Sequence, residues 1–132
     1  HEPFGNDTAC DWAYELVESS DLSYLESAID AVLETDFDDY LEAPEAEEAV
    51  AAIEVLAKLR GQGTQSDSYT EAVDAWVAAS GAKPDAALLE KAQRALDRIR
   101  SPDSELMELW SESEDDGAWK ETMSALRAAV ST

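Results

Sequence analysis

Cysteine and histidine are almost missing from this chain of 132 residues, which holds one of each. A single cysteine excludes an internal disulfide, so we expect a cytoplasmic protein, because thiols stay reduced in that compartment. Nothing basic near Cys10 would lower its pKa, and His1 lies at the very end of the chain, where fraying is common. We therefore interpret Cys10 as an inert, buried side chain. One histidine and one cysteine also make a transition-metal site untenable, and we expect no cofactor.

Basic residues are scarce as well. The chain has 9 Lys and Arg against 31 Asp and Glu, a formal charge of −22. Residues 1–60 alone hold 17 acids and 2 bases, a charge of −15. Such a charge repels nucleic acid and anionic membrane surfaces and attracts basic proteins. An acidic surface also keeps proteins soluble without further function, and the composition leaves both interpretations open.

Long apolar runs are absent from the sequence. The longest, such as AVAAI and AWVAA, fall far short of the roughly 20 residues of a membrane-spanning helix. The start of the chain lacks the charged, apolar and small-residue regions of a signal peptide. Because the first residue is not Met, we expect the native N-terminus to be missing or processed.

Glycine and proline, with 5 and 4 residues, stand only between segments of helical periodicity. No stretch shows the sustained two-residue alternation of a half-buried strand. The sequence predicts an all-α fold, a single compact domain over residues 1–132, arranged as an irregular antiparallel bundle of six or seven helices. We predict that these helices start near residues 6, 21, 44, 68, 84, 101 and 117.

Start signals support several of these helices. Asn6 and Asp7 are good N-caps, and Trp12 follows as an aromatic anchor of the core. Ser23 with Glu26 has the spacing of a capping box. Ser68 and Glu71 have the same spacing, at the end of GQGTQSDS (61–68), which we interpret as the one flexible loop of the chain.

One basic stripe contrasts with the acidic remainder. Lys91, Arg94 and Arg98 follow helical spacing on the predicted outer face of the fifth helix. An anion-binding patch is one interpretation, because guanidinium groups clamp carboxylates and phosphates. We favour the plainer one, in which the stripe neutralises neighbouring acids, including Glu90 and Asp97.

The segment PFGNDTACDWAYEL combines Phe4, an Asn6-Asp7 pair and Asp11-Trp12. This pattern resembles the opening signature of a bacterial family catalogued as domain of unknown function 4259. Segments 51–61 and 104–110 and the closing Trp119 are also similar to that family, so the resemblance spans essentially the whole chain. The family's usual Met-Gly-x-Trp-Gly lead is missing here, which again indicates a trimmed N-terminus. The resemblance implies an all-α domain and no particular activity.

Clustered carboxylates raise the question of metal binding. Asp36, Asp38 and Glu47 have the first, third and twelfth spacing of a calcium-binding EF-hand loop. Tyr40 and Leu41 stand where that loop needs an oxygen ligand and a glycine, so we predict no calcium loop. Weak divalent-metal binding, here or at ESEDD (112–116), remains an alternative.

The acidic tract around residues 34–48 is the candidate partner-binding surface. We expect Phe37 and Leu41 to pack inward and leave the position of Tyr40 open. The composition favours a non-enzymatic interaction module that docks a basic protein, such as a toxin, a nuclease or a DNA-binding protein. The alternative is a small enzyme, or a weak divalent-metal-binding protein, that uses clustered carboxylates. The candidate residues are Glu34, Asp36, Asp38, Asp39, Tyr40, Glu42, Glu45, Glu47 and Glu48.

Overall fold

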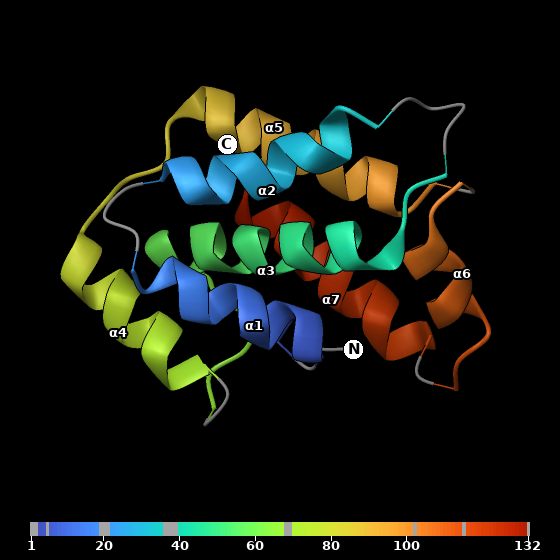
Figure 1. The fold of residues 1–132 in the computed structure, drawn as a ribbon, viewed down its shortest axis with the longest axis horizontal. Helices are drawn as coiled ribbons and strands as arrows, with labels where there is room; N and C mark the ends of the chain where they lie inside the picture. Colours follow the sequence, from blue (N-terminus) through green and yellow to red (C-terminus); the bar gives the residue numbers. More distant parts are fainter. Residues whose placement is uncertain are drawn as a thin grey trace.

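The structure of the protein is a computed structural model that describes residues 3–4, 6–18, 22–35, 40–67, 70–101, 103–114 and 116–131. Over these residues the chain forms seven α-helices and no strand, which confirms the predicted all-α bundle (Figure 1). The helices are α1 (Asp7–Leu16), α2 (Ser23–Leu33), α3 (Ala43–Leu59), α4 (Glu71–Ser80), α5 (Ala86–Ile99), α6 (Glu105–Ser111) and α7 (Asp116–Ala129).

Helix α3 is the centre of the bundle. It contacts each of the other six helices, and Figure 1 shows it in the middle of the molecule, with α2 and α1 on either side of it. Every residue from 49 to 57 is buried, Glu54 included. Four alanines in this stretch let neighbouring helices approach closely, because their side chains occupy little space. Helix α3 therefore has no solvent-facing side along its middle turns.

Large apolar side chains from the ends of the sequence fill the core around α3. Trp12 is only 4% exposed, as predicted, and Trp119 is 2% exposed. Trp119 stacks against Trp110, with ring centroids 6.2 Å apart and ring planes 5° from parallel. Met123 and Leu126 on α7 are also fully buried.

Side-chain caps define three of the helix starts. Asn6 accepts a hydrogen bond from the backbone N–H of Ala9 at 2.7 Å, as its position predicted. Asp85 caps α5 through the N–H of Leu88, so this helix begins two residues after Pro84, where we had placed its start. Ser104 caps the short α6. Each cap satisfies a backbone donor that the first helical turn leaves without an internal partner.

Two local predictions near the N-terminus are wrong. Helix α2 has Leu22 as its N-cap, without a side-chain hydrogen bond, because Ser23 is already in the first helical turn; the Ser23–Glu26 capping box does not form. Helix α1 ends at Leu16, so Val17 leaves the apolar face and is 41% exposed. Tyr14 is 73% exposed on the same helix. The polar residues Thr8, Asp11, Glu15 and Glu18 follow one narrow stripe of the helical pattern, which predicts a single solvent-facing strip. The exposed Tyr14 and Val17 make the solvent-facing side of α1 wider than that. The other predicted capping box begins at Ser68, outside the described residues.

Candidate functional site

Residues 40–42 lie against the start of α6. The backbone N–H of Leu41 donates to the carbonyl oxygen of Asp103 at 2.9 Å, and the N–H of Glu105 donates to the carbonyl oxygen of Leu41 at 2.8 Å. Leu41 is fully buried, as expected. This short bridge fixes the entry to α3 beside the acidic side chains of α6. Four residues of the predicted tract, Asp36, Phe37, Asp38 and Asp39, lie outside the described residues.

Two glutamates of α6, which no pattern in the sequence places near residue 40, complete the acidic surface. Tyr40 is 44% exposed, and its hydroxyl donates to Glu108 Oε2 at 2.5 Å. This hydrogen bond, with partial burial and the nearby carboxylates, raises the pKa of Tyr40 to about 12, so the phenol stays neutral. Glu105 accepts the backbone N–H of Ala43 at 2.7 Å.

The first turns of α3 carry the remaining candidates. Glu42 and Glu45 are exposed, whereas Glu47 and Glu48 are half-buried toward α1. Burial raises the pKa of Glu47, and the charge of Glu105 adds to this, although a hydrogen bond with Thr8 lowers it. Glu34 is exposed at the end of α2, and no interaction among the described residues joins it to this group. We define the acidic face as Tyr40, Glu42, Glu45, Glu47, Glu48, Glu105 and Glu108.

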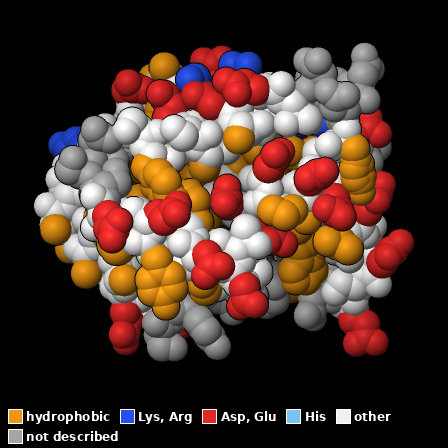
Figure 2. Space-filling model, viewed as in Figure 1, with side chains coloured by type: hydrophobic (Ala, Val, Ile, Leu, Met, Phe, Trp, Pro, Cys, Tyr) orange, Lys and Arg blue, Asp and Glu red, His pale blue; other side chains and the backbone are white. Residues whose placement is uncertain are grey.

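Four basic residues form ion pairs elsewhere in the fold. Ion pairs join Lys58 to Glu54 and Asp74, Lys91 to Glu26 and Asp30, Lys120 to Asp116, and Arg127 to Asp97. Within the described ranges, no ion pair includes a member of the acidic face. Figure 2 shows carboxylates spread over the side of the molecule where α1 and α3 lie in front, with hydrophobic side chains between them. Most visible Lys and Arg side chains lie at the edges of this view.

The predicted basic stripe of α5 is divided by the fold. Arg98 is only 4% exposed, and its Nη1 donates to Ser101 Oγ at 2.8 Å and to the carbonyl oxygen of Asp103 at 3.2 Å. The placement of Arg98 on the outer face is therefore wrong, because the turn after α5 folds back over it. Of the three, only Arg94 is exposed.

The partners predicted for that stripe also differ. Lys91 pairs with α2, at 3.4 Å from Glu26 and 3.1 Å from Asp30, and these contacts raise its pKa. Asp97 pairs instead with Arg127 of α7, with Nε and Oδ1 3.1 Å apart. Of the stripe, Lys91 joins α5 to α2 and Arg98 holds the turn after α5, so the three side chains offer no continuous anion-binding patch.

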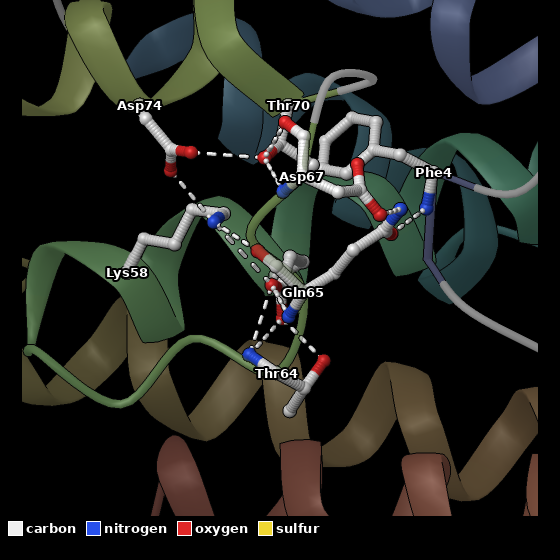
Figure 3. Close-up of polar contacts among 8 residues, drawn as sticks. Phe4, Lys58, Thr64, Gln65, Asp67, Thr70 and Asp74 are labelled. Atoms are coloured by element: carbon white, nitrogen blue, oxygen red, sulfur yellow. Dashed lines mark hydrogen bonds and ion pairs between the residues drawn. The ribbon is translucent and has the colours of Figure 1, made fainter.

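A buried polar network surrounds Glu54, a residue that is not among the candidates predicted from the sequence. The backbone N–H of Thr64 donates to both carboxylate oxygens of Glu54, at 3.0 and 2.9 Å, and its hydroxyl donates to Oε1 at 2.8 Å (Figure 3). The N–H of Gln65 donates to Oε2 at 2.8 Å. Residues 62–65 are therefore tied to α3, and the prediction of a flexible loop is wrong for them.

Lys58 extends the network toward α4. Its ammonium donates to the carbonyl oxygen of Gln65 and, at 2.7 Å, to Asp74 Oδ1, and it lies 3.8 Å from Glu54 Oε2. Gln65 in turn accepts the backbone N–H of Phe4 at 2.8 Å. Figure 3 shows these groups pointing toward one another from the N-terminal segment, α3, α4 and the segment that joins α3 to α4. A general base or nucleophile needs a lone pair available to substrate, whereas these groups satisfy one another; we interpret the network as structural.

Cys10 has the properties of a structural thiol. It is partly buried, and its thiol donates to the carbonyl oxygen of Phe4 at 3.5 Å. Burial, followed by the charges of Asp7, Asp11 and Asp67, raises the pKa of Cys10. A raised pKa reduces the thiolate that a reactive cysteine requires. The inertness of Cys10 toward thiol reagents remains a prediction.

Several carboxylates of the two candidate metal sites lie outside the part of the chain that the structure describes. They are Asp36 and Asp38 of the EF-hand spacing and Asp115 of the ESEDD segment. Asp116 pairs with Lys120 at 3.1 Å. In the part of the chain that the structure describes, no group of three or more His, Cys, Asp and Glu side chains is arranged to hold a metal ion.

Among the described segments, none of the helices combines the length and apolarity needed to cross a membrane.

Comparison with known proteins places the chain in a family. Neither a curated protein nor a solved structure matches the chain. A family model matches residues 1–122, which confirms the resemblance seen in the opening segment. The chain thus belongs to the family described as Domain of unknown function (DUF4259).

Proposed function

We propose that this protein is a non-enzymatic interaction module that docks a basic protein through the acidic face. The observation that carries the proposal is the absence of counter-charge: the ion pairs of the described residues all lie away from these carboxylates. A basic partner would supply that charge, and complementary potentials accelerate encounter and fix orientation. A basic toxin, nuclease or DNA-binding protein has the required chemistry. The single cysteine supports a cytoplasmic location.

Exposed apolar side chains on and beside the acidic face support docking of a protein rather than binding of free cations alone. Leu109 is 52% exposed and lies one helical turn after Glu105; Tyr40 adds an aromatic ring. Interfaces combine such anchors with a polar rim. The alternative of a small enzyme has less support, because the most polar interior region, around Glu54, is satisfied by its own hydrogen bonds.

A titration with a basic peptide tests the proposal. An Arg- and Lys-rich peptide is added to ¹⁵N-labelled protein, and backbone amide shifts are followed by NMR. We expect the largest shifts in residues 40–48 and 105–109, and we expect them to diminish with added salt, since exposed charges are screened beyond about 8 Å at physiological ionic strength. A peptide of the same length with Gln at each basic position is the control. Shifts centred on α5 and α7, or equal shifts with the neutral peptide, would contradict the proposal.

A further inference from the structure

A hollow of about 210 Å³ lies between α1 and α2, over the first half of α3. Figure 1 shows these three helices side by side, with α3 between the other two. The lining includes Trp12 and Glu15 from α1, Tyr24 and Ala31 from α2, and Glu48 from α3. The hollow thus adjoins the acidic face, which shares Glu48 with it, and combines aromatic rings, small side chains and two carboxylates.

The aromatic rings form one wall of the hollow. Trp12 and Tyr24 stack with ring centroids 5.1 Å apart and planes 18° from parallel. The hydroxyl of Tyr24 donates to Glu15 Oε2 at 2.8 Å. Burial, then this hydrogen bond and the charges of Glu15 and Glu48, raise the pKa of Tyr24. Tyr24 therefore remains a neutral phenol that orients the Glu15 carboxylate beside the aromatic stack.

Glu48 is the unexplained group. It is half-buried in the hollow, yet no lysine, arginine or hydrogen-bond donor meets its carboxylate among the residues described. Its neighbours Glu15 and Glu45 carry the same charge, and burial followed by these charges raises its pKa. A carboxylate that is partly removed from water without a donor is unfavourable. A cation placed between Glu15 and Glu48 would relieve both the desolvation and the repulsion.

A second hollow shows the contrast. It has about 220 Å³, lies between the starts of α2 and α5, and is lined by Glu26 and Asp85 together with Lys83. This second hollow includes a cation of its own, and Glu26 is paired with Lys91. Only the hollow between α1 and α2, of these two, combines carboxylates and aromatic rings with no basic side chain in its lining.

We propose that the hollow between α1 and α2 receives the side chain of an arginine residue of the basic partner, an assignment that rests on the proposed function. A guanidinium is planar, stacks on aromatic rings and presents donors in a fork that matches carboxylates. Glu15 and Glu48 accept its N–H groups, and Tyr24 lies along its plane. The ammonium of lysine is compact and strongly hydrated and fits an aromatic wall less well.

Small-molecule probes test the hollow directly. N-acetyl-arginine amide, its lysine counterpart and the neutral isostere N-acetyl-citrulline amide are titrated into labelled protein, and the Trp12 indole N–H is followed by NMR. We expect a saturable shift with arginine at millimolar concentrations, binding at least about threefold weaker for lysine, and no saturation with citrulline. Equal responses to arginine and citrulline, or to arginine and lysine, would overturn the assignment.

Matched variants distinguish the hollow from general acidity. Glu15→Gln/Glu48→Gln should weaken arginine binding at least about tenfold, whereas Glu71→Gln/Glu121→Gln removes as much charge from exposed positions on α4 and α7 and should change it less than about twofold. Ala31→Leu fills the hollow without changing charge and should also abolish the Trp12 response, with circular dichroism confirming the fold. Equal losses in the two charge variants would contradict the proposal.

The same titrations separate this proposal from the function it rests on. If the basic peptide shifts residues 40–48 and 105–109 but leaves the Trp12 indole unchanged, the arginine site is wrong and the docking function stands. If arginine amide saturates the Trp12 signal but the basic peptide does not bind, the hollow is a free-cation site, which overturns both. Peptide binding whose Trp12 response is lost in Ala31→Leu supports both.

Discussion

The carboxylate of Glu54 accepts the backbone N–H of Thr64 with both of its oxygens, at 3.0 and 2.9 Å. Glu54 is fully buried on the central helix, and Thr64 belongs to a segment whose composition is that of a surface loop. One side chain of α3 thus fixes the path of the chain between α3 and α4.

Replacing Glu54 with Gln should destabilise the protein by about 2–4 kcal/mol. The amide would place an NH₂ group against the N–H groups of Thr64 and Gln65, leaving a buried donor without an acceptor, and Lys58 would lose a neighbouring charge. Urea unfolding measures the change in the free energy of unfolding. Glu45→Gln is the control on the exposed part of α3, with a change within about 0.5 kcal/mol. Similar small changes in both variants would show that the network contributes little.

Gly63→Ala should cost about 1–3 kcal/mol, as overpacking of a closely packed site does. A Cβ at this position would lie 2.6 Å from Lys58 Cγ and 3.4 Å from Glu54 Oε2. The Lys58 side chain cannot easily move away, because its ammonium is held by Gln65 and Asp74. Gly117→Ala is the matched control: nothing lies within 4 Å of its Cβ, in the first turn of α7. It should raise stability by up to about 1 kcal/mol. Thermal unfolding that ranks the two variants the other way would contradict this packing.

Arg98→Gln and Arg94→Gln should differ, although both remove one charge from α5. Arg98 is buried and donates to Ser101 and Asp103, so its loss should cost about 2–3 kcal/mol, the range of hydrogen bonds to charged groups. Arg94 is exposed, and its loss should cost at most about 0.5 kcal/mol. Added salt should not restore the stability of Arg98→Gln, because the missing interactions are short-ranged and buried. If its stability returned to the wild-type value at high salt, Arg98 would act through surface electrostatics instead.

Stability should pass through a maximum at mildly acidic pH. Burial raises the pKa of Glu47 and Glu48 above the ordinary value of 4.5, so the folded state binds more protons than the unfolded one and loses stability as pH rises from 4.5 toward neutrality. Burial alone would raise the pKa of Asp74, but hydrogen bonds from Lys58 and Thr70 and the charge of Lys58 lower it below 3.8. The stabilisation that Asp74 contributes is therefore present above pH 3.8 and is lost as the pH falls below that value.

Chemical denaturation at a series of pH values checks this profile. Glu48→Gln should flatten the decline above pH 4.5, because it removes one of the groups whose pKa is raised in the folded state. A wild-type stability that rises steadily from pH 5 to 8 would contradict the environment assigned to Glu48.

The helices and most of the core could be predicted from the sequence, because both follow local rules. The place of Trp12 in the first helical segment identified it as a core residue, and Asn6 was identified as a cap from its residue type and position. The predicted helix starts near residues 21 and 84 were less accurate, because α2 begins at Ser23 and α5 at Ala86, and residue type alone does not determine which of several neighbouring residues becomes the N-cap. The stretch from 49 to 57 held one usable signal: a lone Glu54 among apolar residues indicates a buried, paired carboxylate.

The candidate site could be predicted only in part, because its members come from separate segments. Glu105 and Glu108 join the acidic face through Leu41 and Tyr40, about 65 residues earlier in the chain. Arg98 has the periodicity of an exposed stripe, and only the return of residues 101–103 buries it. The hollow depends on three helices at once. No local pattern of the sequence contains such contacts.

The most direct test of the docking proposal compares two triple variants of equal charge. Glu42→Gln/Glu45→Gln/Glu108→Gln alters the acidic face, and Glu71→Gln/Glu90→Gln/Glu121→Gln removes three exposed carboxylates from α4, α5 and α7. Affinity for the basic peptide is measured by calorimetry across a salt series. We predict a loss of about tenfold or more for the face variant and less than about twofold for the control, with the difference narrowing as salt rises. Equal losses in the two variants would show that net charge alone attracts the peptide and would contradict a defined docking face.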